Sequence, residues 1–474
     1  KGNPSTFTYY TQPLYVAVSP RTQFVHLPGK VPVDFYIVNE KNLSGKYRLS
    51  VSVCTPDGKE GKHIEKEVHI TGGDCFGQLL LENCQLAIEG ASGLYQVKAQ
   101  LRNTSGHLCA EGKDEVLGIY WDEKQLKGKG ALYGTPDDPV ATFYQKATGC
   151  ELPAFRSDME KLDWIVVTRS SLDAPQPVPV EAFCQKEGKS VLELSLYKDD
   201  DLRTLAGVTQ DNKIDRTFAD GAQPDPLLPA NQSFSAIWDG KLKAPQSGTY
   251  MIGVTSDQGM RLSVNGQRIV DEWRNNKELT VVRPFLLKAG DEVAVRVEYS
   301  QRNPTGSVQL VWSLPDHAAI APQELLDRVR EDGTSLLLLK SAESWMDAVS
   351  AYTGSAYHGY YSVGKNWVGG VHFVKEHPLF NGLPVNVAMG WPYQALVRNG
   401  DRRLGLHIDN EELVAGSYSS APFNLGSAVG IISCGKGKIY YSTLDLVDNL
   451  NNPAAAADVA RKLFCNFILL SKDR

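Results

Sequence analysis

The side chains best suited to binding a small polar molecule lie in one polar loop and at two later positions. Asp257 and Gln258 offer a carboxylate and an amide, and Asn303 offers a second amide. Planar polar groups of this kind pair with sugar hydroxyls, while an aromatic ring covers the apolar face of a sugar. Trp273 or Trp238 would supply the ring, but Trp238 falls in an alternating core pattern. We therefore predict a carbohydrate-binding site of Asp257, Gln258, Trp273 and Asn303. A purely turn-forming role for Asp257-Gln258 is an equal alternative.

Side chains with the spacing of a catalytic or metal site are absent from the sequence pattern. Glycoside hydrolysis needs two opposed carboxylates on rigid strands, and the acidic runs at 199–201 and 271–272 are typical of solvated faces. His358, His372 and His377 are candidate metal ligands, but the spacing of the last two does not place both on one helical face. No carboxylate pair accompanies them. We predict no catalytic residue, no metal site and no cofactor.

The sequence pattern contains neither a nucleophile in a suitable turn nor a phosphate-binding loop. A nucleophile on a tight strand-to-helix turn requires glycine two residues before and two residues after it. Neither Cys434 nor Ser341 has glycine at either position. The stretch SVGKNWVGG is rich in glycine but lacks the strand and helix that flank a phosphate-binding loop. The sequence therefore predicts neither amidotransferase or protease activity nor phosphate binding.

Strands must position the polar loop at 255–259, and the sequence on both sides of it alternates. Apolar residues recur at every second position, which places them on one face of a strand. Asn265-Gly266 is suited to a two-residue hairpin turn. The alternating stretches are 250–254, 262–264, 293–299 and 308–312. This pattern predicts an all-β sandwich or barrel.

The same region resembles the protective-antigen (PA14) domain family over about residues 191–315, in FSAIWDGKLKAPQSGTYMIGVTSDQGMRLSVNGQRIVDEW, LLKAGDEVAVRVEYSQ and VQLVWSLP. The family's motifs appear in order and at family spacing. The resemblance implies a β-sandwich of a kind that often binds carbohydrate and often lies within glycosidases and adhesins. Calcium-dependent adhesins of this family carry two adjacent aspartates where this chain has Asp257-Gln258. The resemblance therefore implies weak calcium binding or none.

The N-terminal region is predicted to be a second β-rich domain. Residues 14–122 alternate between apolar and polar positions with the turn spacing of an immunoglobulin-like sandwich. PLYVAVSPRTQFVHLPGKVPVDFYIVNEKNLSGKYRLSVSV and SGLYQVKAQL are similar to the sandwich domains that follow the barrel in glycoside hydrolase family 2 enzymes. Residues 1–13 read as a linker. The first residue is Lys rather than Met, so we expect a fragment or a processed product.

The remaining two segments, 128–180 and 322–474, alternate short apolar strands with helices. That alternation is typical of a parallel α/β sheet. Helices are expected at 137–148, 323–330, 344–352 and 453–470, and strands at 131–133, 164–167, 336–339, 429–432 and 438–441. KEHPLFNGLP, MGWPYQALV and GKGKIYYSTLDLVDNL are similar to a class I glutamine-amidotransferase-like domain of the flavodoxin-like type.

The predicted fold is thus multidomain, β and α/β. An immunoglobulin-like sandwich precedes a parallel α/β (flavodoxin-like) domain, which a PA14 β-sandwich at 188–316 interrupts. Insertion at a surface loop would leave the host sheet intact.

The length, net charge and cysteine content of the chain limit these interpretations. A chain of 474 residues suggests about three domains. A net charge of −6 disfavours nucleic acid as a partner, and no apolar run approaches the roughly 18 residues of a membrane span. The eight cysteines lack metal-site spacing. One or two disulfides among Cys54, Cys75, Cys84 and Cys109 are an alternative to free thiols, which we favour.

Taken together, the resemblances imply a non-catalytic carbohydrate-binding and scaffolding region at the C-terminal end of a secreted glycoside hydrolase. The implied parent is family 2-like (β-galactosidase-like) and acts on polysaccharide or oligosaccharide. The expected partners are carbohydrate and an upstream catalytic barrel domain of the same polypeptide. The expected location is secreted, periplasmic or cell-surface. The alternatives are a cell-surface adhesion module without a hydrolase, and an enzyme that uses the α/β domain.

Overall fold

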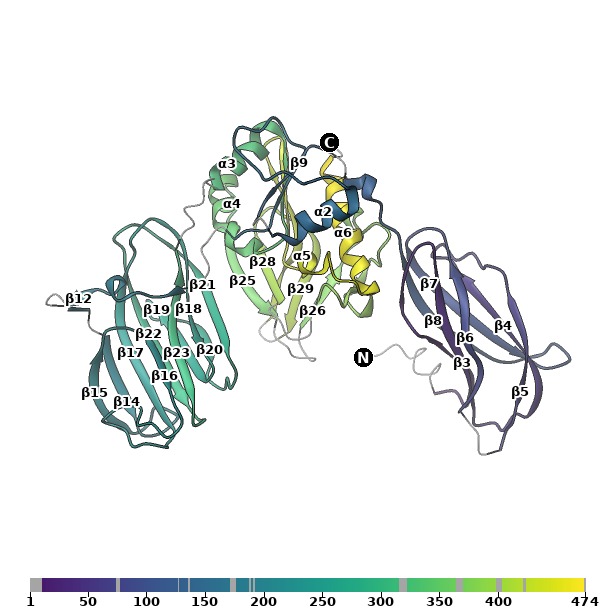
Figure 1. Cartoon of the computed structure of the whole chain (residues 1–474), viewed down its shortest axis with the longest axis horizontal. Helices are drawn as coiled ribbons and strands as arrows, with labels where there is room; N and C mark the ends of the chain where they lie inside the picture. Colours follow the sequence, from purple (N-terminus) through teal and green to yellow (C-terminus); the bar gives the residue numbers. More distant parts are fainter. Residues whose placement is uncertain are drawn as a thin grey trace. The chain divides into compact units, whose positions relative to one another are not determined.

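The computed structural model describes residues 11–73, 77–126, 128–134, 137–170, 176–186, 189–190, 192–314, 322–363, 370–397, 403–420 and 423–472. The chain divides into two compact units (Figure 1). The first unit comprises Lys1–Arg169, Gln323–Glu343 and Ser350–Arg474, and the second comprises Ser170–Pro322 and Ser344–Val349. Strands dominate both units, as the alternating patterns predict.

The N-terminal part of the first unit is a sandwich of two sheets. One sheet contains β1 (Leu14–Pro20), β3 (Gly29–Asn39) and β6 (Gly77–Ile88). The other has the order β2 (Phe24–His26), β8 (Leu108–Ile119), β7 (Gly93–Arg102), β4 (Gly45–Cys54) and β5 (Ile64–Ile70). Alternate residues of β3 and β7 are fully buried in one shared core, including Val33, Phe35 and Val97. The immunoglobulin-like topology of this sandwich stays a prediction.

The rest of the first unit is built on one mixed sheet of ten strands. Its parallel strands are β9 (Gly130–Tyr133), β10 (Trp164–Val167), β24 (Ser335–Leu338) and β31 (Gly437–Ser442). The antiparallel strands are β25 (Tyr357–Val363), β26 (Gly370–Val374), β27 (Val387–Ala388), β28 (Arg403–Ile408), β29 (Glu412–Ser420) and β30 (Phe423–Cys434). Four strands therefore form a parallel sheet as predicted. The six antiparallel strands in the same sheet do not support the predicted flavodoxin-like fold.

Helices accompany this sheet where the local signals predict them. In α2 (Pro139–Thr148), the Asp138 carboxylate accepts a hydrogen bond from the Val140 N–H (2.8 Å), and Gly149 ends the helix at φ 73°. The last helix, α6 (Asp458–Lys472), buries Phe464 and Phe467 completely and contacts β10 and β24. The other α-helices are α3 (Pro322–Asp327), α4 (Met346–Thr353) and α5 (Leu446–Asn449).

The second unit is a sandwich of a five-stranded and a six-stranded sheet. The first contains β11 (Gln176–Pro177), β23 (Gly306–Ser313), β18 (Gly248–Ser256), β21 (Leu279–Leu287) and β16 (Asp215–Phe218). The second has the order β15 (Leu205–Asp211), β14 (Leu192–Tyr197), β17 (Phe234–Lys243), β22 (Glu292–Gln301), β19 (Gly259–Val264) and β20 (Gln267–Glu272). Two short strands, β12 (Gln185–Lys186) and β13 (Lys189–Ser190), form a separate hairpin.

The turn and the strand alternation that the sequence predicts for the second unit are present in the structure. Asn265 and Gly266 connect β19 to β20 with φ angles of 49° and 81°, which confirms the predicted hairpin turn. Tyr250, Ile252 and Val254 on β18 are fully buried between the sheets. The first strand of the unit, β11, pairs with its last strand, β23, in the register Gln176↔Trp312.

Within the described residues, Cys54, Cys84, Cys109, Cys150, Cys184, Cys434 and Cys465 are free thiols, as we favoured, and Cys75 lies outside those residues. Among the same residues, no helix combines the length and the apolarity that crossing a membrane would need.

Candidate functional site

The predicted polar loop is a crossing between the two sheets of the second unit. β18 ends at Ser256 and β19 begins at Gly259, so only Asp257 and Gln258 separate them. β18 and β19 belong to different sheets. The fully buried Ser256 shapes the crossing, because its hydroxyl accepts a hydrogen bond from the Gln258 N–H (3.0 Å) and donates to the Ser307 carbonyl (2.6 Å).

Gln258 joins this crossing to the β22–β23 connection, which we define as residues 302–305. Its side chain is buried, with 3% of its surface exposed. The amide nitrogen Nε2 donates to the Thr305 carbonyl (3.1 Å), and Oε1 accepts from the Arg302 N–H (3.2 Å). Both functional groups of Gln258 are therefore used inside the protein, and the residue acts as a clamp on the connection.

Asp257 holds the start of β23, just after this connection. Its Oδ1 atom accepts a hydrogen bond from the Ser307 N–H (2.7 Å), and the side chain is half-buried. Burial, and then the negative charge of Asp257, raise the pKa of Tyr299 beneath the connection. The Tyr299 hydroxyl donates to the side-chain oxygen of Gln301, the last residue of β22.

Trp273 is enclosed by charged groups. Only 7% of its surface is exposed, and its indole N–H donates to Asp201 Oδ1 (3.1 Å). The guanidinium carbon of Arg261 lies 4.3 Å from the ring centroid, and that of Arg302 lies 5.7 Å away. Arg302 is held in turn by Asp200 (2.9 Å). The ring therefore offers no open face for a sugar in this conformation, which differs from the stacking role that the sequence suggests.

Asn303 is the predicted site residue that faces solvent most openly. Its backbone carbonyl accepts from Gln301 Nε2 (3.0 Å), which fixes the backbone at that position. The residue lines an open depression of about 330 Å³. We call it the Asn303 depression. Its exposed polar lining residues are Asp220, Asn231, Gln232, Ser233 and Asn303, and its other lining residues are Phe218, Ala219, Gly221, Ala222, Pro224, Phe234, Gln301, Arg302 and Pro304.

The four predicted residues therefore meet around one segment, the β22–β23 connection and its two ends. Two of them, Gln258 and Trp273, support that segment from inside. Asn303 lies on its surface, and Asp257 is half-buried at its end.

Two parts of the site escaped the sequence interpretation. The acidic run at 199–201 is no solvated face, because backbone N–H groups of Arg203, Thr204 and Asp201 bond Asp199 and lower its pKa to about 2. The loop between β16 and β17 supplies most of the Asn303 depression. Its composition, ADGAQPDPLLPANQS, was the available signal.

The histidine candidates separate in the structure. His372 is buried on β26. His377 caps a short helical turn by accepting a hydrogen bond from the Leu379 N–H at Nδ1 (3.2 Å), and burial lowers its pKa. Only His358 joins a cluster of possible ligands, with His407 and Asp409 in place of the other two histidines.

The two candidate nucleophiles lie in different settings. Cys434 is buried at the end of β30, at the predicted hairpin, and burial raises the pKa of its thiol. Ser341 follows β24 at φ 52°, in the left-handed region, even though it lacks flanking glycines. The absence of amidotransferase activity stays a prediction.

The comparison with protein families addresses the second unit. Residues 188–325 match the family model described as the PA14 domain. The chain contains a PA14 domain. The glycoside hydrolase family 2 and amidotransferase-like resemblances of the other segments remain predictions.

Individual relatives are similar over limited regions. The anti-sigma-I factor RsgI3 of Acetivibrio thermocellus is 29% identical over 117 residues, which are 25% of this chain and 18% of that protein. A β-glucosidase structure from Kluyveromyces marxianus is 15% identical over 46% of this chain and 29% of its own, with a TM-score of 0.26. A PA14 sugar-binding domain from an RTX adhesin is 19% identical over 26% of this chain and 87% of its own, with a TM-score of 0.20. This chain thus spans less than a fifth of the curated relative.

Proposed function

We propose that the PA14 domain binds carbohydrate in the Asn303 depression. The observation that carries this proposal is the concentration of exposed amide, carboxylate and hydroxyl side chains around one open hollow beside the β22–β23 connection. An asparagine amide offers two N–H donors and a carbonyl acceptor, which suits neighbouring hydroxyls of a sugar. Asn303 and Asn231 are the residues proposed to contact the ligand directly.

The buried residues then have a positioning role in this proposal. Gln258 clamps the connection, and Trp273 anchors Arg302 at its start. Asp257 fixes the start of β23 at Ser307. Because the Trp273 ring is covered, recognition would depend on hydrogen bonds to the sugar, with little contribution from aromatic stacking.

The wider role we propose is accessory. Two β-sandwiches and a mixed sheet support the role of a scaffolding and carbohydrate-binding region of a secreted glycoside hydrolase. The domain boundaries proposed for it are 14–122, 128–180 with 322–474, and 188–316. A cell-surface adhesion module is the alternative. The sequence of the full-length gene product distinguishes the two roles. A catalytic barrel upstream of this chain would support the first role, and a surface anchor or adhesin repeats would support the second.

A glycan-binding experiment on the full chain tests the proposal. We expect a subset of immobilised neutral oligosaccharides to be bound, and Asn303→Ala to weaken binding at least about tenfold, because a lost pair of ligand hydrogen bonds costs roughly 1.4 kcal/mol or more. Asn231→Ala should weaken it as well. The matched control is Asn212→Ala, whose side chain is exposed in the same sandwich but does not line the depression. Unchanged affinity in Asn303→Ala and Asn231→Ala would refute this placement of the site.

A further inference from the structure

Two neighbouring strands of the mixed sheet bring two histidines opposite each other. β25 and β28 pair antiparallel with Tyr357 opposite Ile408, and the next pair is Tyr360 opposite Leu406. His358 and Gly359 therefore face the single residue His407, which is the arrangement of a β-bulge. Gly359 takes φ 91°, a conformation that favours glycine. A bulge of this kind bends its strand locally.

The sheet also places a carboxylate beside these histidines. Leu406 and Ile408 on β28 are buried, whereas His407 and Asp409 are exposed. Asp409 directly follows Ile408, the last residue of β28, and its side chain is exposed like that of His407. The Asp409 N–H donates to the Ala356 carbonyl just before β25 (2.9 Å), which fixes Asp409 next to His358.

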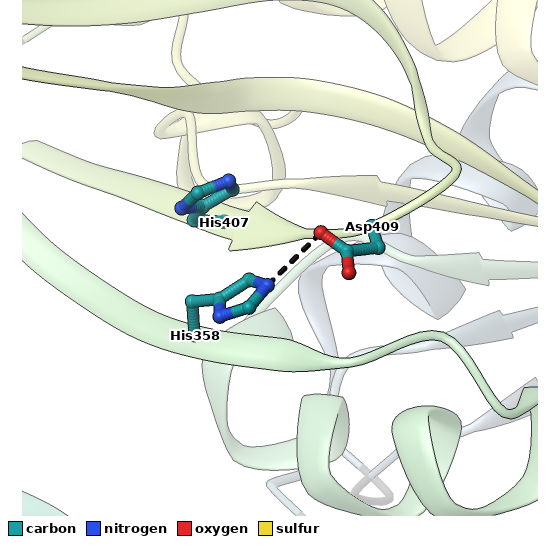
Figure 2. Close-up of side chains that lie close together, drawn as sticks. All are labelled: His358, His407 and Asp409. Carbon is teal, nitrogen blue, oxygen red and sulfur yellow. Dashed lines mark hydrogen bonds and ion pairs between the residues drawn. The ribbon is translucent and has the colours of Figure 1, made fainter.

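The side chains converge on a small volume, as Figure 2 shows. His358 Nε2 lies 2.9 Å from Asp409 Oδ1, and the rings of His358 and His407 have centroids 4.6 Å apart with a tilt of 41°. One potential ligand atom from each of the three residues lies within 4.8 Å of the others. The side chains of His358 and Asp409 are 46% and 50% exposed, so an ion in solution can reach the cluster.

We propose that His358, His407 and Asp409 form a binding site for a divalent transition-metal ion, with zinc as the representative ion. Zinc binds imidazole nitrogen at about 2.0–2.1 Å and carboxylate oxygen at about 2.0–2.2 Å, so two donors on one tetrahedral ion lie roughly 3.3 Å apart. The His358–Asp409 pair already has such a separation. His407 has to approach by about 1.5 Å at most from the present separation, within reach of side-chain rotation.

The donor set selects the class of ion. Two imidazole nitrogens and one carboxylate suit zinc and its neighbours in the first transition row, whereas calcium and magnesium prefer oxygen ligands. Three protein ligands leave a fourth position for water or another ligand, in the manner of an open zinc site.

Zinc binding by the full, untagged chain tests this site. Competition with a chromophoric zinc chelator should show one saturable site, and Co²⁺ should give visible absorption typical of a tetrahedral ion. His358→Gln and His407→Gln should each weaken zinc binding by at least tenfold, since loss of even an outer partner of a metal ligand costs 10–100-fold. The matched control is His107→Gln, whose side chain is exposed in the N-terminal sandwich, and it should leave the affinity unchanged.

A second measurement needs no variant. Zinc should protect His358 and His407 of the wild-type chain from modification by diethyl pyrocarbonate, as measured by peptide mass spectrometry, and should leave His107 reactive. Equal modification of all three histidines with and without zinc would overturn the proposal. Zinc affinity that is unchanged in both folded ligand variants, or the absence of a saturable site in the wild type, would overturn it as well.

Discussion

Replacing Gln258 with alanine tests the clamp that holds the β22–β23 connection. The change removes two hydrogen bonds, to Thr305 and Arg302, and one buried methylene group. At about 1 kcal/mol for each hydrogen bond and about 0.8 kcal/mol for the methylene group, the free energy of unfolding should fall by about 2–3 kcal/mol. For a unit of this size, that loss corresponds to a decrease in Tm of about 5–10 °C.

Calorimetric unfolding of the full chain measures this effect. Gln210→Ala is the control, because Gln210 is exposed on β15 and its loss should change the free energy by less than about 0.5 kcal/mol. Gln258→Glu separates the two bonds, since its carboxylate can still accept from Arg302 but cannot donate to Thr305. If the PA14 transition of Gln258→Ala coincides with that of Gln210→Ala, Gln258 does not clamp the connection and the assignment is refuted.

Four further predictions use other features. Calcium should bind the wild type weakly or not at all, because Gln258 Oε1 is already bonded to Arg302, and titration calorimetry should detect a calcium site, if at all, only in Gln258→Asp. Burial raises the pKa of Glu411, so its contribution to stability is present below its unfolded pKa and lost as the pH rises through its folded pKa; melting at pH 5 and pH 8 should show a smaller pH dependence in Glu411→Gln. A purified fragment of residues 188–316 should unfold cooperatively alone, and aggregation or a noncooperative melt would contradict the insertion. The chain should hydrolyse no aryl-glycoside, and turnover abolished by mutating one of its carboxylates would reverse that expectation.

Elements with local signals were predictable from the sequence. The turn at Asn265-Gly266 and helix α2 depend on residues within a few positions of each other, such as Asp138 and Gly149. The strands β25 to β29 were missed because YHGYYSV and ELVAGSYSS mix glycine, polar and aromatic residues without a clear apolar period. Their pairing is set by partners elsewhere in the sheet, which a pattern along the chain does not contain.

The site shows the same division between local and distant information. Sequence reasoning pointed to Asn303 and Asp257, because short polar residues in loops are visible in one dimension. It did not predict that Trp273 would be covered, since its partner Asp201 lies 72 residues away along the chain. Similarly, His407 and Asp409 lie close together at the end of β28, but His358 lies 51 residues from Asp409 along the chain. Each missed feature required a contact that only the folded chain creates.

The pairing of β11 with β23 has a mechanical consequence. Because Gln176 lies opposite Trp312, the chain enters and leaves the second unit through adjacent, hydrogen-bonded strands. Tension applied to the two flanking segments would load this short pair first and would reach the interior of the sandwich only after the pair had separated. The proposed ligand surface lies at the other end of β23, at the β22–β23 connection. The unit would then transmit tension along the polypeptide, and the ligand surface would keep its shape until β11 separates from β23.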